Sequence, residues 1–293
     1  MPETAQITAP DGRRLEVELA GPQDGLALIF HVGTPCAGRL FAPMVDAGRS
    51  RGVRHITYSR PGYGGSERHA GRTVADCAGD VAAIADALGV QRFLTAGWSG
   101  GGPHALACAG LLGERVIAAA SLAGVAPFGA EGLDWLAGMG QENLDEFGAT
   151  AAGEAELLAY LEREAPAMAA TDAEELLGGL GELLSDVDRR TLTGEFAEYF
   201  ARSTGAAVEN GIWGWFDDDQ AFYRDWGFDL QGLTRPVTIW QGGEDRFVPY
   251  SHGQWLARNV AGAHGELHPE HGHLSLVVGS YGQILDDLLT HAG

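Results

Sequence analysis

The stretch RFLTAGWSGGGPHALACAGLL, residues 92–112, places a serine and a tryptophan among four glycines, between two segments of different character. The segment RFLTA, residues 92–96, is typical of a short buried strand, and PHALACAGLL, residues 103–112, of a helix rich in alanine and leucine. Glycine lets a backbone turn sharply where a Cβ would clash. The run therefore predicts an abrupt strand-to-helix turn with Ser99 at its tip.

The chain on either side of this turn alternates between segments typical of strands and segments typical of helices. The expected strands are residues 13–20 (the second arm of a hairpin), 26–32, 53–59, 116–124, 236–243 and 265–269. The expected helices are residues 38–52, 73–89 and 274–291. Strands that alternate with helices in this way predict a mostly parallel sheet with helices on its faces.

The alternation stops between residues 127 and 229, where patterns such as EAELLAYLEREAPAMAATDAEELLGGLGELL, residues 154–184, are helical. This region holds 23 of the 40 acidic residues of the chain but only 5 of its 19 arginines. Two regions with different surfaces are implied. We therefore expect a core of residues 1–126 and 230–293, interrupted by a helical insertion, residues 127–229, called the insertion below.

Composition limits the classes of partner and compartment. A net charge of −21 disfavours nucleic acids and anionic membranes as partners. The N-terminal stretch has no apolar core typical of a signal peptide, and no apolar run approaches the roughly 20 residues that a membrane span requires. The three cysteines, Cys36, Cys77 and Cys108, fit no zinc motif and are expected to be reduced. These observations predict a cytoplasmic protein without a metal site.

Ser99 lies in a Gly-x-Ser-x-Gly run, which lifts a serine hydroxyl clear of the sheet and points the N-terminus of the next helix at it. A serine nucleophile needs a base and an acid that orients the base. Asp245 follows an expected strand and His273 precedes the last expected helix, so the order is Ser, Asp, His. Competing candidates for the base are His264, His268 and His271, and for the acid Glu244, Asp217, Asp218 and Asp219.

Taken together, these features resemble the α/β-hydrolase fold, in the capped branch that includes esterases, proline iminopeptidases, C–C bond hydrolases and epoxide hydrolases. The stretches that carry the resemblance are FHVGTPCAG (30–38), YSRPGYGGS (58–66), GWSGGG (97–102), GGEDRFVP (242–249) and HGHLSL (271–276). The resemblance covers the chain outside the insertion. It implies a mostly parallel eight-stranded sheet flanked by helices, with the insertion as a cap over the site.

Carried over to this sequence, the resemblance implies Ser99 as nucleophile, Asp245 as orienting acid and His273 as base. It also implies an oxyanion hole of backbone N–H groups from Gly100 and from Thr34 or Gly33. The choice between those two stays open, because Val32 stands where the family usually has histidine and His31 comes one place early. Ser59 stands where the family commonly has aspartate, and we interpret its loop as structural.

The aromatic side chains of the insertion and of the serine turn, and the acidic side chains of the insertion, could either line a substrate pocket or have only a structural role. Candidate pocket residues are Trp98, beside the nucleophile, and Trp213, Trp215 and Phe216 of the insertion. The alternative for Trp98 is that it packs behind the turn. Further aromatic residues, which could equally form the core of a helical bundle, are Trp135, Phe222, Tyr223 and Trp226. We expect the acidic side chains to form a solvated face. The alternative is that one or two of them face inward and bind a substrate ammonium group, as glutamates do in proline iminopeptidases.

A serine at the nucleophile position disfavours dehalogenase and epoxide hydrolase chemistry, which in this family uses aspartate. We expect hydrolysis of a carboxylic ester or related small-molecule acyl substrate through an acyl-enzyme, without a cofactor, by a monomer or homodimer. Open alternatives are a C–C bond hydrolase, an acyltransferase, an aminopeptidase and a non-catalytic small-molecule binder. The aminopeptidase is less favoured because the Gly-Gly-Ser-Trp-Gly run associated with iminopeptidases is missing.

Overall fold

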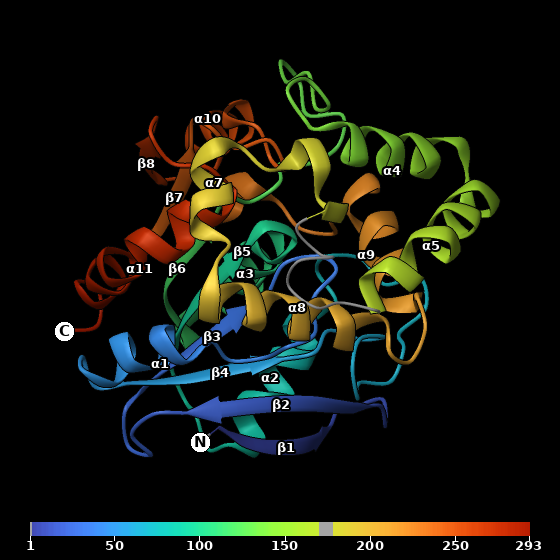
Figure 1. Cartoon of the computed structure of the whole chain (residues 1–293). Coiled ribbons are helices and arrows are strands. Elements are labelled where there is room, and N and C mark those ends of the chain that lie inside the picture. Colours follow the sequence, from blue (N-terminus) through green and yellow to red (C-terminus); the bar gives the residue numbers. More distant parts are fainter. Residues whose placement is uncertain (1, 170–177) are drawn as a thin grey trace.

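The computed structural model describes residues 2–169 and 178–293, and its central feature is an eight-stranded sheet (Figure 1). The strand order is β1-β2-β4-β3-β5-β6-β7-β8, with β1 and β2 antiparallel to their neighbours and all other pairs parallel. The strands are β1 (Glu3–Thr8), β2 (Arg14–Ala20), β3 (Leu26–His31), β4 (Val53–Tyr58), β5 (Phe93–Trp98), β6 (Val116–Leu122), β7 (Val237–Gly242) and β8 (His264–His268). The predicted mostly parallel sheet is confirmed.

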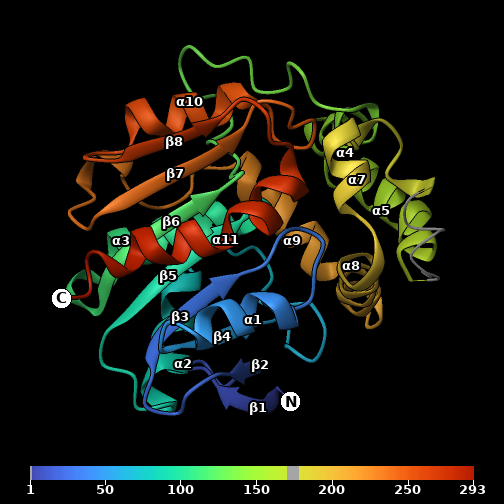
Figure 2. The same cartoon turned by 60° about the vertical axis from the view of Figure 1, so that its left-hand side comes forward.

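Helices cover both faces of the sheet, as Figure 2 shows. On one face are α1 (Ala42–Arg49) and α11 (His273–Leu289), and on the other α2 (Cys77–Ala87), α3 (Gly102–Leu111) and α10 (Tyr250–Asn259). Every residue of β5, β6 and β7 is buried. Strands enclosed on both sides read as continuous apolar runs, which is why the sequence predicted them so readily.

Two expected helices begin later than their sequence patterns suggest. The expected helix 38–52 starts at Ala42, because Gly38 lies directly against the backbone of Tyr58 and holds the preceding loop to the sheet. The expected helix 73–89 starts at Cys77, because the Asp76 carboxylate accepts hydrogen bonds from the backbone N–H and hydroxyl of Thr73 at 2.6 and 2.9 Å. These local turns compete with the first helical turn.

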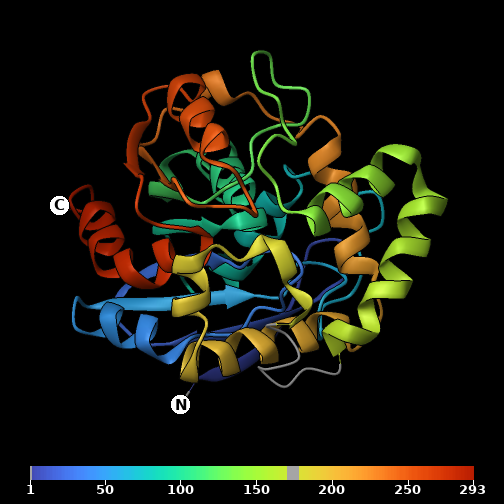
Figure 3. The same cartoon turned by 45° about the horizontal axis from the view of Figure 1, so that its top comes forward.

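Between β6 and β7 the chain leaves the sheet and forms helices beside the carboxyl ends of the parallel strands (Figures 2 and 3). These are α4 (Gln141–Ala152), α5 (Glu154–Ala169), α7 (Asp186–Thr191), α8 (Gly194–Val208) and α9 (Trp213–Tyr223). Short 3₁₀ turns are η1 (Ser99–Gly101), η2 (Gly113–Arg115), η3 (Gly181–Leu183) and η4 (Leu230–Gly232). The helix expected across residues 170–177 lies outside the described residues.

Three cysteines lie in the interior, and all are free, as predicted. Within residues 2–169 and 178–293, no helix combines the length and apolar character needed to cross a bilayer.

Candidate active site

Ser99 occupies the turn between β5 and α3 with a left-handed backbone, at a φ of 56°. A positive φ is uncommon for a residue with a side chain and signals strain that the surroundings must hold. Neighbouring backbone segments pack tightly around this turn and hold Ser99 in its strained conformation. A Cβ atom at Gly97 would clash with the carbonyl of Gly101, and a Cβ atom at Gly101 would clash with the carbonyl of His31. The glycines on both sides of Ser99 are therefore a steric requirement.

Asp245 and His273 meet at the same edge of the sheet. Nδ1 of His273, the first residue of α11, lies 2.8 Å from Oδ2 of Asp245, and both side chains are buried. The other carboxylate oxygen of Asp245 accepts the backbone N–H groups of Phe247 and Val248, at 2.9 and 2.8 Å. Burial raises the pKa of Asp245, against the lowering effect of His273. This contact assigns Nδ1 of the ring to the carboxylate, and Nε2 is the nitrogen that does not take part in it.

The imidazole of His273 also packs against two aromatic rings. The Phe247 ring stacks on it with centroids 4.5 Å apart, and the Trp98 ring lies 5.4 Å away. The rival histidines are engaged elsewhere: His264 contacts Glu266 at 2.9 Å, His268 stacks on Trp240, and His271 packs against His268.

The loop after β3 lies against Ser99. A Cβ at Gly33 would be 3.3 Å from that of Ser99, and one at Gly100 would clash with the Thr34 hydroxyl. Gly33, Thr34 and Gly100, the residues predicted to supply oxyanion donors, are thus adjacent to Ser99. His31, in contrast, is fully buried in the sheet, with Nε2 3.2 Å from the Thr95 hydroxyl.

Sequence reasoning missed the group that holds this loop, a buried cluster centred on Asp218 of α9. Arg60 donates to the carbonyls of Val32 and Gly33 at 2.5 and 2.9 Å, and pairs with Asp218 at 2.5 Å. The Thr34 hydroxyl donates to the same carboxylate at 2.6 Å. Through this cluster, a helix of the insertion fixes the backbone beside Ser99.

The charge of Asp218 is balanced within the protein. Arg72 forms a second ion pair with it at 2.7 Å, and the Tyr63 hydroxyl donates to it at 2.9 Å. Burial by itself raises the pKa of Asp218, but the charges of Arg60 and Arg72 outweigh it and hold the pKa below its usual range. The sequence motif YSRPGYGGS therefore has a structural role, as expected, and Arg60 is the residue through which it holds the loop after β3.

Asp188 of α7 is a second residue that the sequence did not indicate. Its side chain is fully buried and accepts the backbone N–H groups of His273, Leu274 and Ser275, each at 2.9 Å. A carboxylate is well suited to cap the positive end of a helix. Because α11 begins at His273, this carboxylate of the insertion fixes the start of the helix that carries the candidate base.

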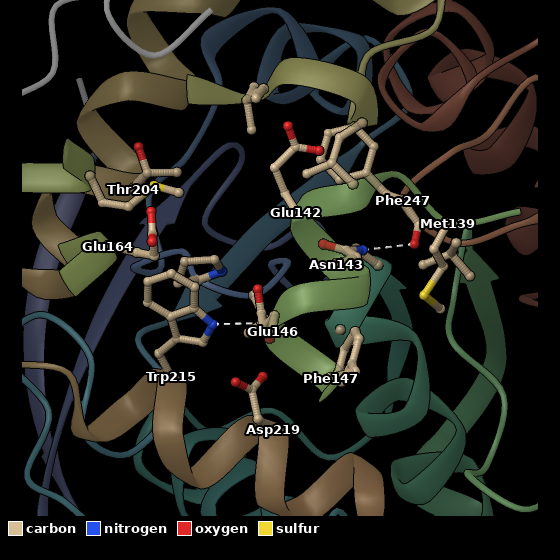
Figure 4. A pocket seen from close by; sticks show the side chains of 18 of the residues that line it. Met139, Glu142, Asn143, Glu146, Phe147, Glu164, Thr204, Trp215, Asp219 and Phe247 are labelled. Atoms are coloured by element: carbon tan, nitrogen blue, oxygen red, sulfur yellow. Dashed lines mark hydrogen bonds between the residues drawn. The ribbon is translucent and has the colours of Figure 1, made fainter. Parts of the chain in front are cut away.

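A cavity with a volume of about 120 Å³ opens beside Ser99 and is walled by both the sheet edge and the insertion (Figure 4). Thr34, Ser99 and Gly100 line it from the sheet side. From the insertion and from the loop after Asp245, the lining includes Met139, Glu142, Glu146, Phe147, Glu164, Trp215, Asp219, Phe222 and Phe247.

The predicted pocket aromatics were only partly right. Trp215 lines the cavity, but Trp98, Trp213 and Phe216 do not. Trp98 packs behind the turn, where its indole N–H donates to the His273 carbonyl at 3.3 Å. Trp213 is 40% exposed and stacks under the Arg68 guanidinium, and Phe216 packs against Trp213. The helical positions of these rings follow from packing against neighbours that the local pattern cannot specify.

The expectation that the acidic side chains of the insertion form only a solvated face was wrong. Asp188, Asp217, Asp218 and Asp219 are buried, and Asp219 lines the cavity. Three glutamates, Glu142, Glu146 and Glu164, line it too.

The sequence matches the model of the family described as "alpha/beta hydrolase fold" over residues 27–279, and the chain belongs to that family. The resemblance inferred from the motifs is thereby confirmed at the level of the fold family. Among curated proteins, the chain is 33% identical to a non-heme chloroperoxidase of Streptomyces lividans over 97 residues, which are 33% of this chain and 35% of the relative. It is 32% identical to a 3-oxoadipate enol-lactonase of Acinetobacter baylyi over 100 residues, 34% and 37% of the two chains. The matches thus span only about a third of these relatives.

Solved structures resemble the chain over nearly its full length. An esterase from Exiguobacterium antarcticum superposes with a TM-score of 0.70 at 20% identity, covering 99% of both chains. A bromoperoxidase from Bacillus anthracis gives 0.71 at 21% identity, covering 98% of this chain and 100% of the other. An enol-lactonase from Burkholderia xenovorans gives 0.70 at 17% identity, with the same coverage. At this level of identity the similarity shows the fold.

Proposed function

We propose that the protein is a serine hydrolase that cleaves a carboxylic ester or related acyl substrate through an acyl-enzyme. The observation that carries the proposal is the set of side chains at the sheet edge: Ser99 in a strained turn, and the buried His273–Asp245 pair, whose imidazole packs against Trp98, the residue before Ser99. Several relatives bear the names esterase and enol-lactonase, which both denote cleavage of ester bonds. Their agreement favours ester substrates over amides.

In the proposed reaction, Ser99 Oγ attacks the substrate carbonyl while His273 Nε2 takes up the hydroxyl proton. Asp245 orients the imidazole and stabilises its charge. The developing oxyanion accepts hydrogen bonds from the N–H of Gly100 and of Thr34 or Gly33. The alcohol leaves with the proton from His273, and a water activated by the same ring then releases the acid.

We propose further that the insertion, residues 127–229, acts as a lid that shapes the cavity. Support comes from the cavity lining, which combines residues of α4, α5 and α9 with Ser99. Such a wall restricts the access of bulk water to the site and selects the acyl group.

A fluorophosphonate probe tests the proposal directly, because it reacts covalently only with an activated serine. We expect mass spectrometry to find one phosphonate on Ser99, p-nitrophenyl esters of short acids to be hydrolysed, and Ser99→Ala to abolish both reactions. An inert protein with an intact fold would refute the catalytic role and favour a small-molecule binder.

A further inference from the structure

Three consecutive aspartates in α9, Asp217, Asp218 and Asp219, are buried, but among the described residues only two of them form an ion pair. Asp217 pairs with Arg68 at 2.8 Å, and Asp218 pairs with the two arginines described above. Within the described part of the chain, Asp219 has no ion pair, and neither of its fully buried oxygens accepts a hydrogen bond from an N–H group or hydroxyl. Its side chain belongs to the wall of the cavity (Figure 4).

The neighbour of Asp219 is another carboxyl group, that of Glu146 in α4. Trp215 donates its indole N–H to Glu146 at 2.8 Å, and Asp219 lies on the same side of the cavity (Figure 4). Burial raises the pKa of Glu146 to about 7, against the opposing contacts with Trp215 and Asp219. Burial, reinforced by the Glu146 charge, raises the pKa of Asp219 well above its ordinary value. The charge of Arg72 opposes this rise in the pKa of Asp219 but does not cancel it.

The rest of the wall adds negative charge and aromatic surface. Glu142 and Glu164 also line the cavity. Oε2 of Glu142 is buried and has no hydrogen-bond partner among the residues that the structure describes, whereas Glu164 is partly exposed and pairs with Arg163. Among the described lining residues there is no arginine, lysine or histidine. The rings that share the wall belong to Phe147, Tyr160, Trp215 and Phe222.

We propose that the Glu146–Asp219 pair is a binding subsite for a cationic nitrogen, an ammonium group carried by the substrate. Buried carboxylates are costly unless they are paired. A ligand ammonium would supply a positive charge between the two carboxyl groups and donate hydrogen bonds to the oxygens of Asp219. Aromatic faces nearby favour the same kind of ligand through cation–π contacts. That the ammonium belongs to a substrate rests on the proposed function. That the pair binds an ammonium group does not depend on it.

Binding is tested without catalysis, by isothermal titration of the wild-type protein with n-butylammonium and, as the neutral isostere, n-butanol. We expect the ammonium to bind at least tenfold more tightly than the alcohol at pH 7. Because the cation favours ionised carboxylates, binding at pH 6 should release up to about one proton, measured as a dependence of the enthalpy on the buffer. Equal affinity for the two ligands would overturn the proposal.

Variants locate the subsite. Glu146→Gln retains an acceptor for the Trp215 indole, and Asp219→Asn preserves the shape of its side chain; each should weaken butylammonium binding at least tenfold and remove the proton release. Glu162→Gln, on the exposed side of α5, is the matched control and should leave binding unchanged. Circular dichroism checks the fold of each variant. If both pocket variants fold and bind like the wild type, the two carboxyl groups form only a structural pair that shares a proton, and the proposal is wrong.

Kinetics then connect the subsite to the substrate. In a series of p-nitrophenyl ω-aminoalkanoates and their N-acetyl derivatives, we expect kcat/KM to favour a free amine at least tenfold at the chain length that spans Ser99 and the pair. Glu146→Gln should remove this preference, and Glu162→Gln should not. Hydrolysis without amine preference or amine binding would refute the subsite alone. Amine binding by a protein that hydrolyses no ester would refute the proposed function alone.

Discussion

The carboxyl edge of the sheet and the insertion differ in where the hydrogen-bond partners of their buried carboxylates come from. At the sheet edge, polar groups are held by nearby turns: the Asp245 carboxylate is bound by the N–H groups of Phe247 and Val248, two and three residues away. In the insertion, Asp188 and Asp218 are held by residues 85 and 158 positions distant. The difference teaches that reactive groups can be built from local turns, whereas the shape and charge of the cavity depend on contacts between distant segments.

The largest effect should come from the sheet edge. His273→Ala removes the proposed base, and we expect kcat to fall by a factor of about 10⁴ to 10⁶, because the members of such a unit act together. His271→Ala, two residues away and outside the Asp245 contact, should keep most activity. Steady-state hydrolysis of p-nitrophenyl esters measures both, and a reversal of the two results would move the base to His271.

The second-largest effect is expected on the free energy of unfolding, from a substitution in the insertion. Asp218→Asn leaves Arg60 and Arg72 without their shared buried partner, so the free energy of unfolding should fall by about 3 to 5 kcal/mol. Asp217→Asn is the matched neighbour and should cost less, because its partner Arg68 is 31% exposed. Denaturant unfolding compares the two. An equal loss of unfolding free energy in the two variants would show that Asp217 and Asp218 contribute equally to stability, against the difference in their ion pairs.

A smaller effect tests whether the insertion positions the candidate base. Asp188→Asn removes the charge that holds the first N–H groups of α11, and we expect kcat to fall about 10- to 100-fold with little change in KM. The exposed Asp186 of the same helix provides the control, Asp186→Asn, which should behave as wild type. A change confined to KM, or to thermal stability, would show that Asp188 does not act through His273.

The smallest effect is expected on the pH dependence of stability, from the carboxyl groups that line the cavity. The folded-state pKa values of Glu146 and Asp219 are both raised. For Glu146, the stability associated with the protonated form is present at low pH and is lost as pH rises through its folded-state pKa of about 7. Glu146→Gln cannot ionise and can donate to Asp219, although the charges of Asp218 and Arg72 still act on the Asp219 carboxyl group. We expect the variant to be more stable than wild type at pH 8 by about 1 to 2 kcal/mol, and similar at pH 5.

Chemical unfolding at the two pH values measures this difference. A variant less stable than wild type at pH 8 would show that Glu146 is already ionised at no cost.

The sequence by itself determined the parallel sheet, the turn at Ser99, and the positions of Asp245 and His273. These depend on patterns a few residues long: apolar runs of strands buried on both faces, glycines that the backbone requires, and polar residues that follow strand ends. Only the tertiary structure decided the roles of Asp188, Asp217, Asp218 and Asp219. Three adjacent aspartates are identical in sequence, yet one meets a partly exposed arginine, one meets two buried arginines, and one meets a second carboxyl group. The ionisation of a buried carboxyl group depends on the charges that packing brings to it, and these come from segments far away along the chain.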